Sequence, residues 1–107
     1  MSVFGEILRD IPAQNFGVEG IDVRIVPVEA GTLFFVSADR DVDFPAHKHG
    51  AQSSLVVSGE CRLTIGGKTT THSSGEMYTI PEGAEHSIRM SAGYAEIDFV
   101  ADRTGDE

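Results

Sequence analysis

The sequence predicts an all-β protein built from many short strands. From Gly20 onward, runs of four to eight residues rich in Val, Ile, Phe and Thr follow one another. Gly, Pro and Asp residues separate these runs at fairly regular intervals. No long segment between them shows the 3.6-residue apolar period of a helix. This combination is typical of a β-sandwich or a β-barrel.

The run boundaries predict where the strands lie. A Gly66-Gly67 pair between two runs indicates a tight hairpin, because both positions of such a turn favour glycine. Ser58-Gly59, Ala30-Gly31 and Ala92-Gly93 interrupt the pattern in a similar way. The expected strands are Asp22–Glu29, Thr32–Ala38, Ser53–Val57, Glu60–Ile65, Lys68–His72, Met77–Ile80, His86–Met90 and Tyr94–Val100.

The chain divides into an N-terminal arm, residues 1–19, a barrel, residues 20–101, and a C-terminal tail, residues 102–107. In the arm, Phe4, Ile7, Leu8 and Ile11 have helix-like spacing and Pro12 would end a helix. A short helix and an irregular arm are both open for this segment. A length of 107 residues fits a single domain.

Composition narrows the classes of partner. Seventeen acidic and eight basic residues give a net charge of −9, which argues against binding to nucleic acid or to anionic membranes. No apolar run approaches the roughly 20 residues of a membrane span. The first residues also lack the apolar core of a signal peptide, so we expect a cytoplasmic protein. Cys61 is the only cysteine, which agrees with a reducing compartment, and its strand-like setting predicts a buried thiol.

The histidines suggest a metal site. In a strand, residues two apart point to the same face, so His47 and His49 would project together. Two imidazoles on one face can bind a divalent metal through neutral ring nitrogens. The pair alone is a weak signal, but Gln52 and Gly59 follow it at short, defined spacings.

A second segment carries further signals. Gly75 and Gly83 suit positions that need positive φ or close backbone approach. Pro81 fixes a turn and should end the strand before it, because it cannot donate to a ladder. His86 then opens the next strand.

Together these two segments resemble the paired motifs of the cupin superfamily. Gly75, Pro81, Gly83 and His86 match the second motif at every spacing except the last, where Met90 stands in place of the usual Asn. That Asn is not a metal ligand in the family.

The first cupin motif is matched less completely. His47, His49 and Gly59 fit it, while Asp41 occupies the upstream Gly position. Gln52 stands six residues before Gly59 and so takes the place of the family's glutamate, although its gap from His49 is one residue short.

The resemblance implies a double-stranded β-helix, or jelly-roll barrel, and a divalent metal ion. The implied ligands are His47, His49 and His86, with Gln52 or a water as the fourth. A neutral Gln ligand would leave the metal nearly two positive charges, which would favour an anionic or enolised substrate. Zn, Fe, Ni, Mn and Cu all suit such a donor set. A homodimer is usual in the family.

Other residues admit two interpretations. On the last strand, Glu96 and Asp98 alternate with an apolar face that we expect to be core. They either face the cavity, as a ligand partner or general base, or form a solvated outer face. Tyr78 either faces the pocket or packs, and His72 is expected on a solvated edge or outer face. Ser54 shares the strand face of Gln52, and Ile88 and Met90 share that of His86. One of Phe34 and Phe35 must point outward, which would suit a dimer interface.

Three functions are therefore considered. The first is a metal-dependent enzyme, of isomerase, lyase, decarboxylase or dioxygenase type, acting on a small oxygen-bearing or anionic molecule. The sequence identifies no catalytic acid or base for it. The second is a non-catalytic small-ligand binding or sensor module, and the third a metal-free storage or scaffold role. The three histidines favour the first two.

Overall fold

The protein consists of antiparallel β-strands with one short 3-10 helix. The computed structural model describes residues 4–47 and 50–101, and over these ranges it contains no α-helix. The elements are η1 (Gly5–Leu8), β1 (Ala13–Gln14), β2 (Ile21–Val28), β3 (Gly31–Ala38), β4 (Val42–His47), β5 (Gln52–Ser58), β6 (Glu60–Ile65), β7 (Lys68–Ser73), β8 (Met77–Ile80), β9 (His86–Met90) and β10 (Ala95–Ala101).

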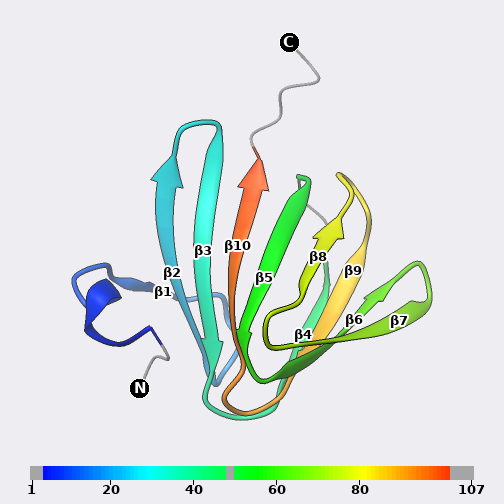
Figure 1. Cartoon of the computed structure of the whole chain (residues 1–107), viewed down its shortest axis with the longest axis horizontal. Coiled ribbons are helices and arrows are strands. Elements are labelled where there is room, and N and C mark those ends of the chain that lie inside the picture. Colours follow the sequence, from blue (N-terminus) through cyan, green and yellow to red (C-terminus); the bar gives the residue numbers. More distant parts are fainter. Residues whose placement is uncertain (1–3, 48–49, 102–107) are drawn as a thin grey trace.

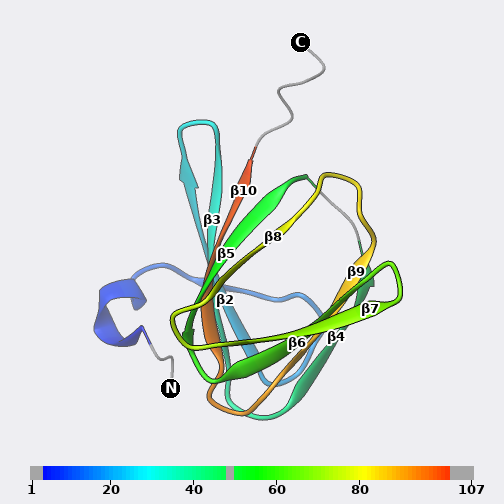
Figure 2. The same ribbon diagram turned by 45° about the vertical axis from the view of Figure 1, so that its right-hand side comes forward.

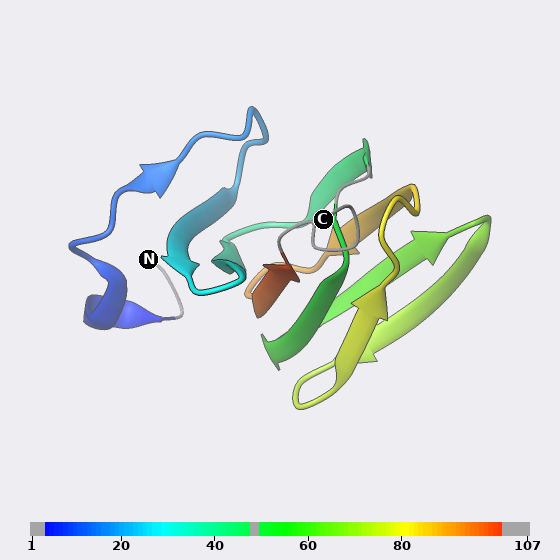
Figure 3. The same ribbon diagram turned by 90° about the horizontal axis from the view of Figure 1, so that it is seen from above.

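The strands form two sheets that face each other (Figures 1 and 2). One sheet has six strands in the order β1-β2-β3-β10-β5-β8, and the other has four in the order β4-β9-β6-β7. The last strand, β10, lies between β3 and β5, so the sheets are joined by crossovers and not only by hairpins. Seen from above, the β6–β7 hairpin and the N-terminal strands lie at opposite sides of the molecule (Figure 3). The predicted all-β jelly-roll architecture is confirmed.

All of the expected strands are present. Glu60–Ile65, Met77–Ile80 and His86–Met90 have the predicted bounds, and the others differ by one residue at one or both ends. The strand prediction omitted β1 and β4. β4 contains Pro45, which an edge strand tolerates, and β4 is indeed at the edge of its sheet.

Glycine sets two of the turns. Gly66 and Gly67 have φ of 58° and 79° between the paired Ile65 and Lys68, which confirms the predicted two-residue hairpin. Gly59 has φ of 76° between β5 and β6, and a Cβ there would lie 2.7 Å from Tyr94 Cα. The turn at Gly59 therefore needs both the left-handed backbone and the absence of a side chain.

The core lies between the two sheets. Alternate side chains of β5, β6, β8 and β9 point inward, as the period of two requires. Cys61 is among them, as predicted, and burial raises the pKa of its thiol to about 11. The buried cluster comprises Val23, Val36, Ala38, Val42, Val56, Cys61, Leu63, Tyr78, Ile80, Ile88, Met90 and Tyr94.

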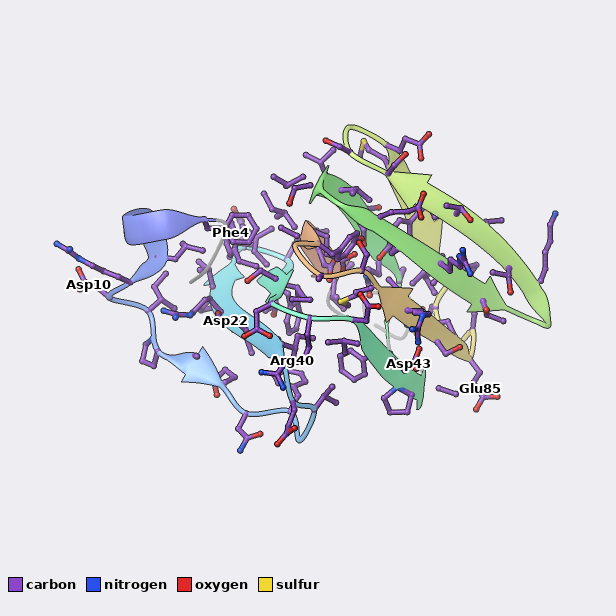
Figure 4. All side chains as sticks on the ribbon, turned by 90° about the horizontal axis from the view of Figure 1, so that it is seen from below. Phe4, Asp10, Asp22, Arg40, Asp43 and Glu85 are labelled. Carbon is purple, nitrogen blue, oxygen red and sulfur yellow. The ribbon has the colours of Figure 1, made fainter. Side chains whose placement is uncertain are left out.

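The N-terminal arm packs against the six-stranded sheet. The Arg24 guanidinium donates to the carbonyl oxygens of Leu8 (3.0 Å) and Ile11 (2.5 Å). Phe4 (labelled in Figure 4) belongs to this arm. Its ring lies edge-on against the outward-facing Phe35, with ring centroids 5.3 Å apart. The arm therefore contains one 3-10 turn and a short strand, β1, paired with β2. The predicted domain boundaries stay predictions.

The last strand corrects one expectation. The apolar face of β10 was predicted to be core, but Ile97 and Phe99 are half-buried on the outer face of the sheet. Glu96 and Asp98 point inward instead, and a solvated outer face for them is wrong. Alternation shows that a strand has two different faces, but the partners of the strand decide which face is inside.

Among residues 4–47 and 50–101, no helix is long and apolar enough to cross a membrane.

Candidate functional site

A cavity of about 370 Å³ lies between the two sheets. In Figure 1 the start of β5, the end of β10 and the start of β9 all lie at the upper end of the barrel. Acidic side chains such as Asp43 and Glu85 lie on the outside of the molecule (Figure 4). The residues that line the cavity are Phe16, Val23, Phe34, Val36, Phe44, His47, Gln52, Leu63, Tyr78, Ile80, His86, Ile88, Met90, Glu96, Asp98 and Val100.

Two of the predicted metal ligands meet at the upper end of this cavity. His47 ends β4 and His86 begins β9, and the two residues are paired across the strands. Their ring centroids are 4.2 Å apart. The ring of Phe44 stacks on His47 at 5.1 Å and restricts its orientation. His86 is 4% exposed, so its ring is held within the barrel.

Backbone carbonyl groups orient both histidine rings. The Nδ1–H of His47 donates to the carbonyl oxygen of Pro45 (2.8 Å), and that of His86 to the carbonyl oxygen of Ala84 (2.9 Å). In the neutral tautomer these bonds select, Nε2 carries the lone pair that a metal ion would take. This is the usual arrangement behind metal-binding histidines.

Gln52 supplies an oxygen beside the histidines. It begins β5, is 8% exposed and donates Nε2–H to Ser54 Oγ at 2.8 Å. That bond leaves its carbonyl Oε1 as the atom suited to a metal ion. The predicted ligand His49 lies outside the described residues. Over the described ranges, no cluster of three or more His, Cys, Asp or Glu is placed to hold a metal, so the four-residue ligand set stays a prediction.

The interior is arranged in layers below these ligands. On β10, Val100, Asp98 and Glu96 point inward opposite Gln52, Ser54 and Val56 of β5. Each layer is two residues along a strand, which is about 7 Å. Ile88 and Met90 continue inward from His86 along β9 and form an apolar wall, as their shared strand face predicted.

Glu96 is buried and hydrogen-bonded to two tyrosines. Its Oε1 accepts hydrogen bonds from Tyr78 Oη (2.6 Å) and Tyr94 Oη (2.5 Å). Burial raises the pKa of both tyrosines well above the usual value, and the adjacent Glu96 carboxyl raises them further. Both phenols therefore stay protonated as donors. Tyr78 lines the cavity, which is the first of the two positions considered for it from the sequence.

Asp98 is buried but has an unused acceptor. It is 7% exposed and lines the cavity. Its Oδ1 is buried without a hydrogen-bond partner, and within the described part of the chain it is the only buried side-chain atom in that condition. Burial raises the pKa of Asp98 well above the usual value, and the nearby Glu96 raises it further.

His72 corrects a smaller expectation. It lies on the edge strand β7, as predicted, but its ring packs against the buried Tyr78 with centroids 4.9 Å apart. Its ring Nε2 is 2.9 Å from Thr70 Oγ1. His72 is not among the residues that line the cavity and therefore serves as a control for the cavity histidines.

Comparison with known proteins decides the family. The family model described as "Cupin domain" matches residues 38–93, more than half of the chain. The chain belongs to the cupin family. That match covers the segments with both cupin-like motifs, from Asp41 to Met90. No match was found among the curated proteins.

Solved cupin structures share this architecture. KdgF from Halomonas sp. is 23% identical with a TM-score of 0.76, over 91% of this cupin and 91% of that chain. An RmlC-like cupin from Shewanella frigidimarina is 21% identical with a TM-score of 0.76, over 99% of this chain and 95% of its own. A predicted oxalate decarboxylase from Thermotoga maritima is 14% identical with a TM-score of 0.73, over 86% and 93% of the two chains. At these identities the likeness shows the fold and not the reaction.

Proposed function

We propose that this cupin is a metal-dependent enzyme that acts on a small oxygen-bearing or anionic molecule. The observation that carries the proposal is the pairing of His47 and His86, both with Nδ1 bonded to a backbone carbonyl, beside Gln52 at one end of an apolar cavity. His49 would complete the ligand set, and the metal would be Zn, Fe, Ni, Mn or Cu.

The donor set fits a divalent metal ion. Neutral imidazoles and an amide oxygen do not cancel the charge of the ion, so it would act as a Lewis acid toward a carbonyl or carboxylate oxygen. The apolar walls of the cavity would exclude water, and the buried polar groups of β10 would orient the substrate. The cavity of about 370 Å³ limits that substrate to a small molecule.

Isomerase, lyase, decarboxylase and dioxygenase chemistry all remain within this proposal. The alternative is a non-catalytic ligand-binding or sensor module. The buried Asp98 carboxyl in the cavity wall favours the enzyme, because a carboxyl with a raised pKa in a cleft is a frequent feature of active sites. A cytoplasmic location, a small-molecule partner and a homodimer belong to the same proposal.

Elemental analysis of protein purified without a histidine tag tests the metal site. We expect about one metal ion per chain, lost in a His47→Ala/His86→Ala variant that keeps its far-ultraviolet circular dichroism. His72→Ala is the matched control, because this histidine lies outside the cavity lining, and it should retain the metal.

Absence of metal from the wild-type protein, together with no uptake on titration with Zn²⁺, would refute the metalloenzyme proposal. Equal metal content in the double variant and the wild type would refute the proposed ligands. Tight binding of small carboxylates without turnover, in a metal-loaded protein, would favour the binding module.

A further inference from the structure

Two buried carboxyl groups on the same face of β10 differ in one respect. Glu96 is 3% exposed, and its Oε1 accepts hydrogen bonds from two tyrosines. Asp98 is 7% exposed, and its Oδ1 has no partner although it is buried. A buried polar atom without a partner is costly, so native proteins rarely keep one without a functional reason.

The position of Asp98 suggests what that reason is. Asp98 lies in the cavity wall opposite Ser54, one layer inward from the Gln52 and Val100 pair. One layer corresponds to about 7 Å along the strands. A small ligand held by an oxygen atom at the histidine end would therefore reach Asp98 with a group a few bonds away.

The other residues in the middle of the cavity provide few free hydrogen-bond acceptors for that group of the ligand. Leu63, Ile80 and Ile88 provide apolar contacts around the middle of the cavity. Glu96 already accepts two phenolic hydrogens on one oxygen. Ser54 Oγ accepts from Gln52 Nε2. Asp98 lines the cavity, and its buried Oδ1 is left as an acceptor without a partner.

We propose that Asp98 Oδ1 is the specificity determinant of the site and accepts a hydrogen bond from a hydroxyl group of the ligand. The ligand class is then a small hydroxylated carboxylate or ketone, with an acceptor oxygen at the histidine end and a hydroxyl three to five bonds farther in. This inference deepens the proposed function and rests on it for the orientation of the ligand. It requires only an acceptor oxygen at Asp98, so an amide at this position should serve as well as a carboxyl.

The test measures binding of matched acids by calorimetry. Butyrate is compared with 2-, 3- and 4-hydroxybutyrate, using wild-type protein, Asp98→Asn and Asp98→Leu. The asparagine keeps an oxygen acceptor in the same place, whereas leucine has a similar branched shape, a larger volume and no acceptor. His72→Ala, outside the residues that line the cavity, is the control.

We expect the wild-type protein to bind at least one hydroxybutyrate about five- to tenfold more tightly than butyrate, as one net hydrogen bond allows. Asp98→Asn and His72→Ala should keep this preference, and Asp98→Leu should bind both acids equally. The inference is overturned if Asp98→Leu retains the preference. It is also overturned if the wild type prefers none of the three hydroxy acids, including the case in which none of them binds.

The same titrations with Zn²⁺-loaded and EDTA-treated protein separate the two proposals. Loss of binding of both butyrate and the hydroxybutyrates on metal removal reports on the metal site. A hydroxyl preference that depends on residue 98, with or without metal, reports on Asp98. Failure of the metal site therefore leaves a distinct result from failure of the Asp98 acceptor.

Discussion

Replacing Asp98 with asparagine should stabilise the protein at neutral pH and leave its stability little changed in acid. Asp98 is buried, and its pKa is raised first by burial and then by the Glu96 carboxyl two residues away. At neutral pH the unfolded chain ionises this residue, whereas the native chain must keep a proton on it or bury a charge. An asparagine at the same position has no such cost, and its amide can donate to Glu96.

The sign and size follow from linkage. An unfolded aspartate has a pKa of about 3.9, so above that pH the native state binds a proton that the unfolded state has released. The free energy of unfolding of the wild type therefore falls as the pH rises from about 4 to the raised pKa of Asp98. The contribution is about 1.4 kcal/mol for each unit by which the pKa is raised. Below pH of about 4 both states are protonated, and the difference disappears.

The assay is urea unfolding of wild type and Asp98→Asn, in EDTA, at pH values from 4 to 8. The difference between the two free energies of unfolding should grow with pH in favour of the variant. Asp10→Asn, on an exposed carboxylate, is the control and should follow the wild-type pH profile. A difference that stays constant from pH 4 to 8, or that favours the wild type at high pH, would refute the reasoning.

Three further predictions concern neighbouring features of the barrel. Cys61 should react slowly with a thiol reagent in the native state at pH 8, because burial raises its pKa to about 11, and rapidly after denaturation; fast native labelling would contradict its burial. Tyr94→Phe should lower the free energy of unfolding by about 1–3 kcal/mol, because Glu96 loses one of two donors inside the barrel, and an unchanged urea midpoint would show that the bond is dispensable. Leu55 and Met77 are paired across adjacent strands and are 39% and 66% exposed, so we expect this face to join two copies of the chain. Light scattering should show a dimer that the Leu55→Glu/Met77→Glu variant converts to a monomer. A monomeric wild type would contradict this expectation.

Much of the barrel was predictable from the sequence because its signals are local. The glycine pair at Gly66-Gly67 defines a hairpin through its own backbone preferences, and Pro81 ends β8 because it lacks an N–H. The resemblance to the cupin motifs implied that His47, Gln52 and His86 share a site, and these residues do line one cavity.

The tertiary structure decided what local pattern leaves open. Alternation along β10 separates Glu96 and Asp98 from Ile97 and Phe99, but it does not say which set faces the core. The pairing of β10 with β3 and β5 turns the carboxyl groups of Glu96 and Asp98 inward. There Glu96 accepts a hydrogen bond from Tyr78, which lies on a strand distant in the sequence. Hydrogen bonding and burial depend on such long-range neighbours. The sequence by itself therefore determined the barrel fold and the candidate histidine ligands. Only the packing of the two sheets placed Asp98, with its unpartnered oxygen, in the cavity wall.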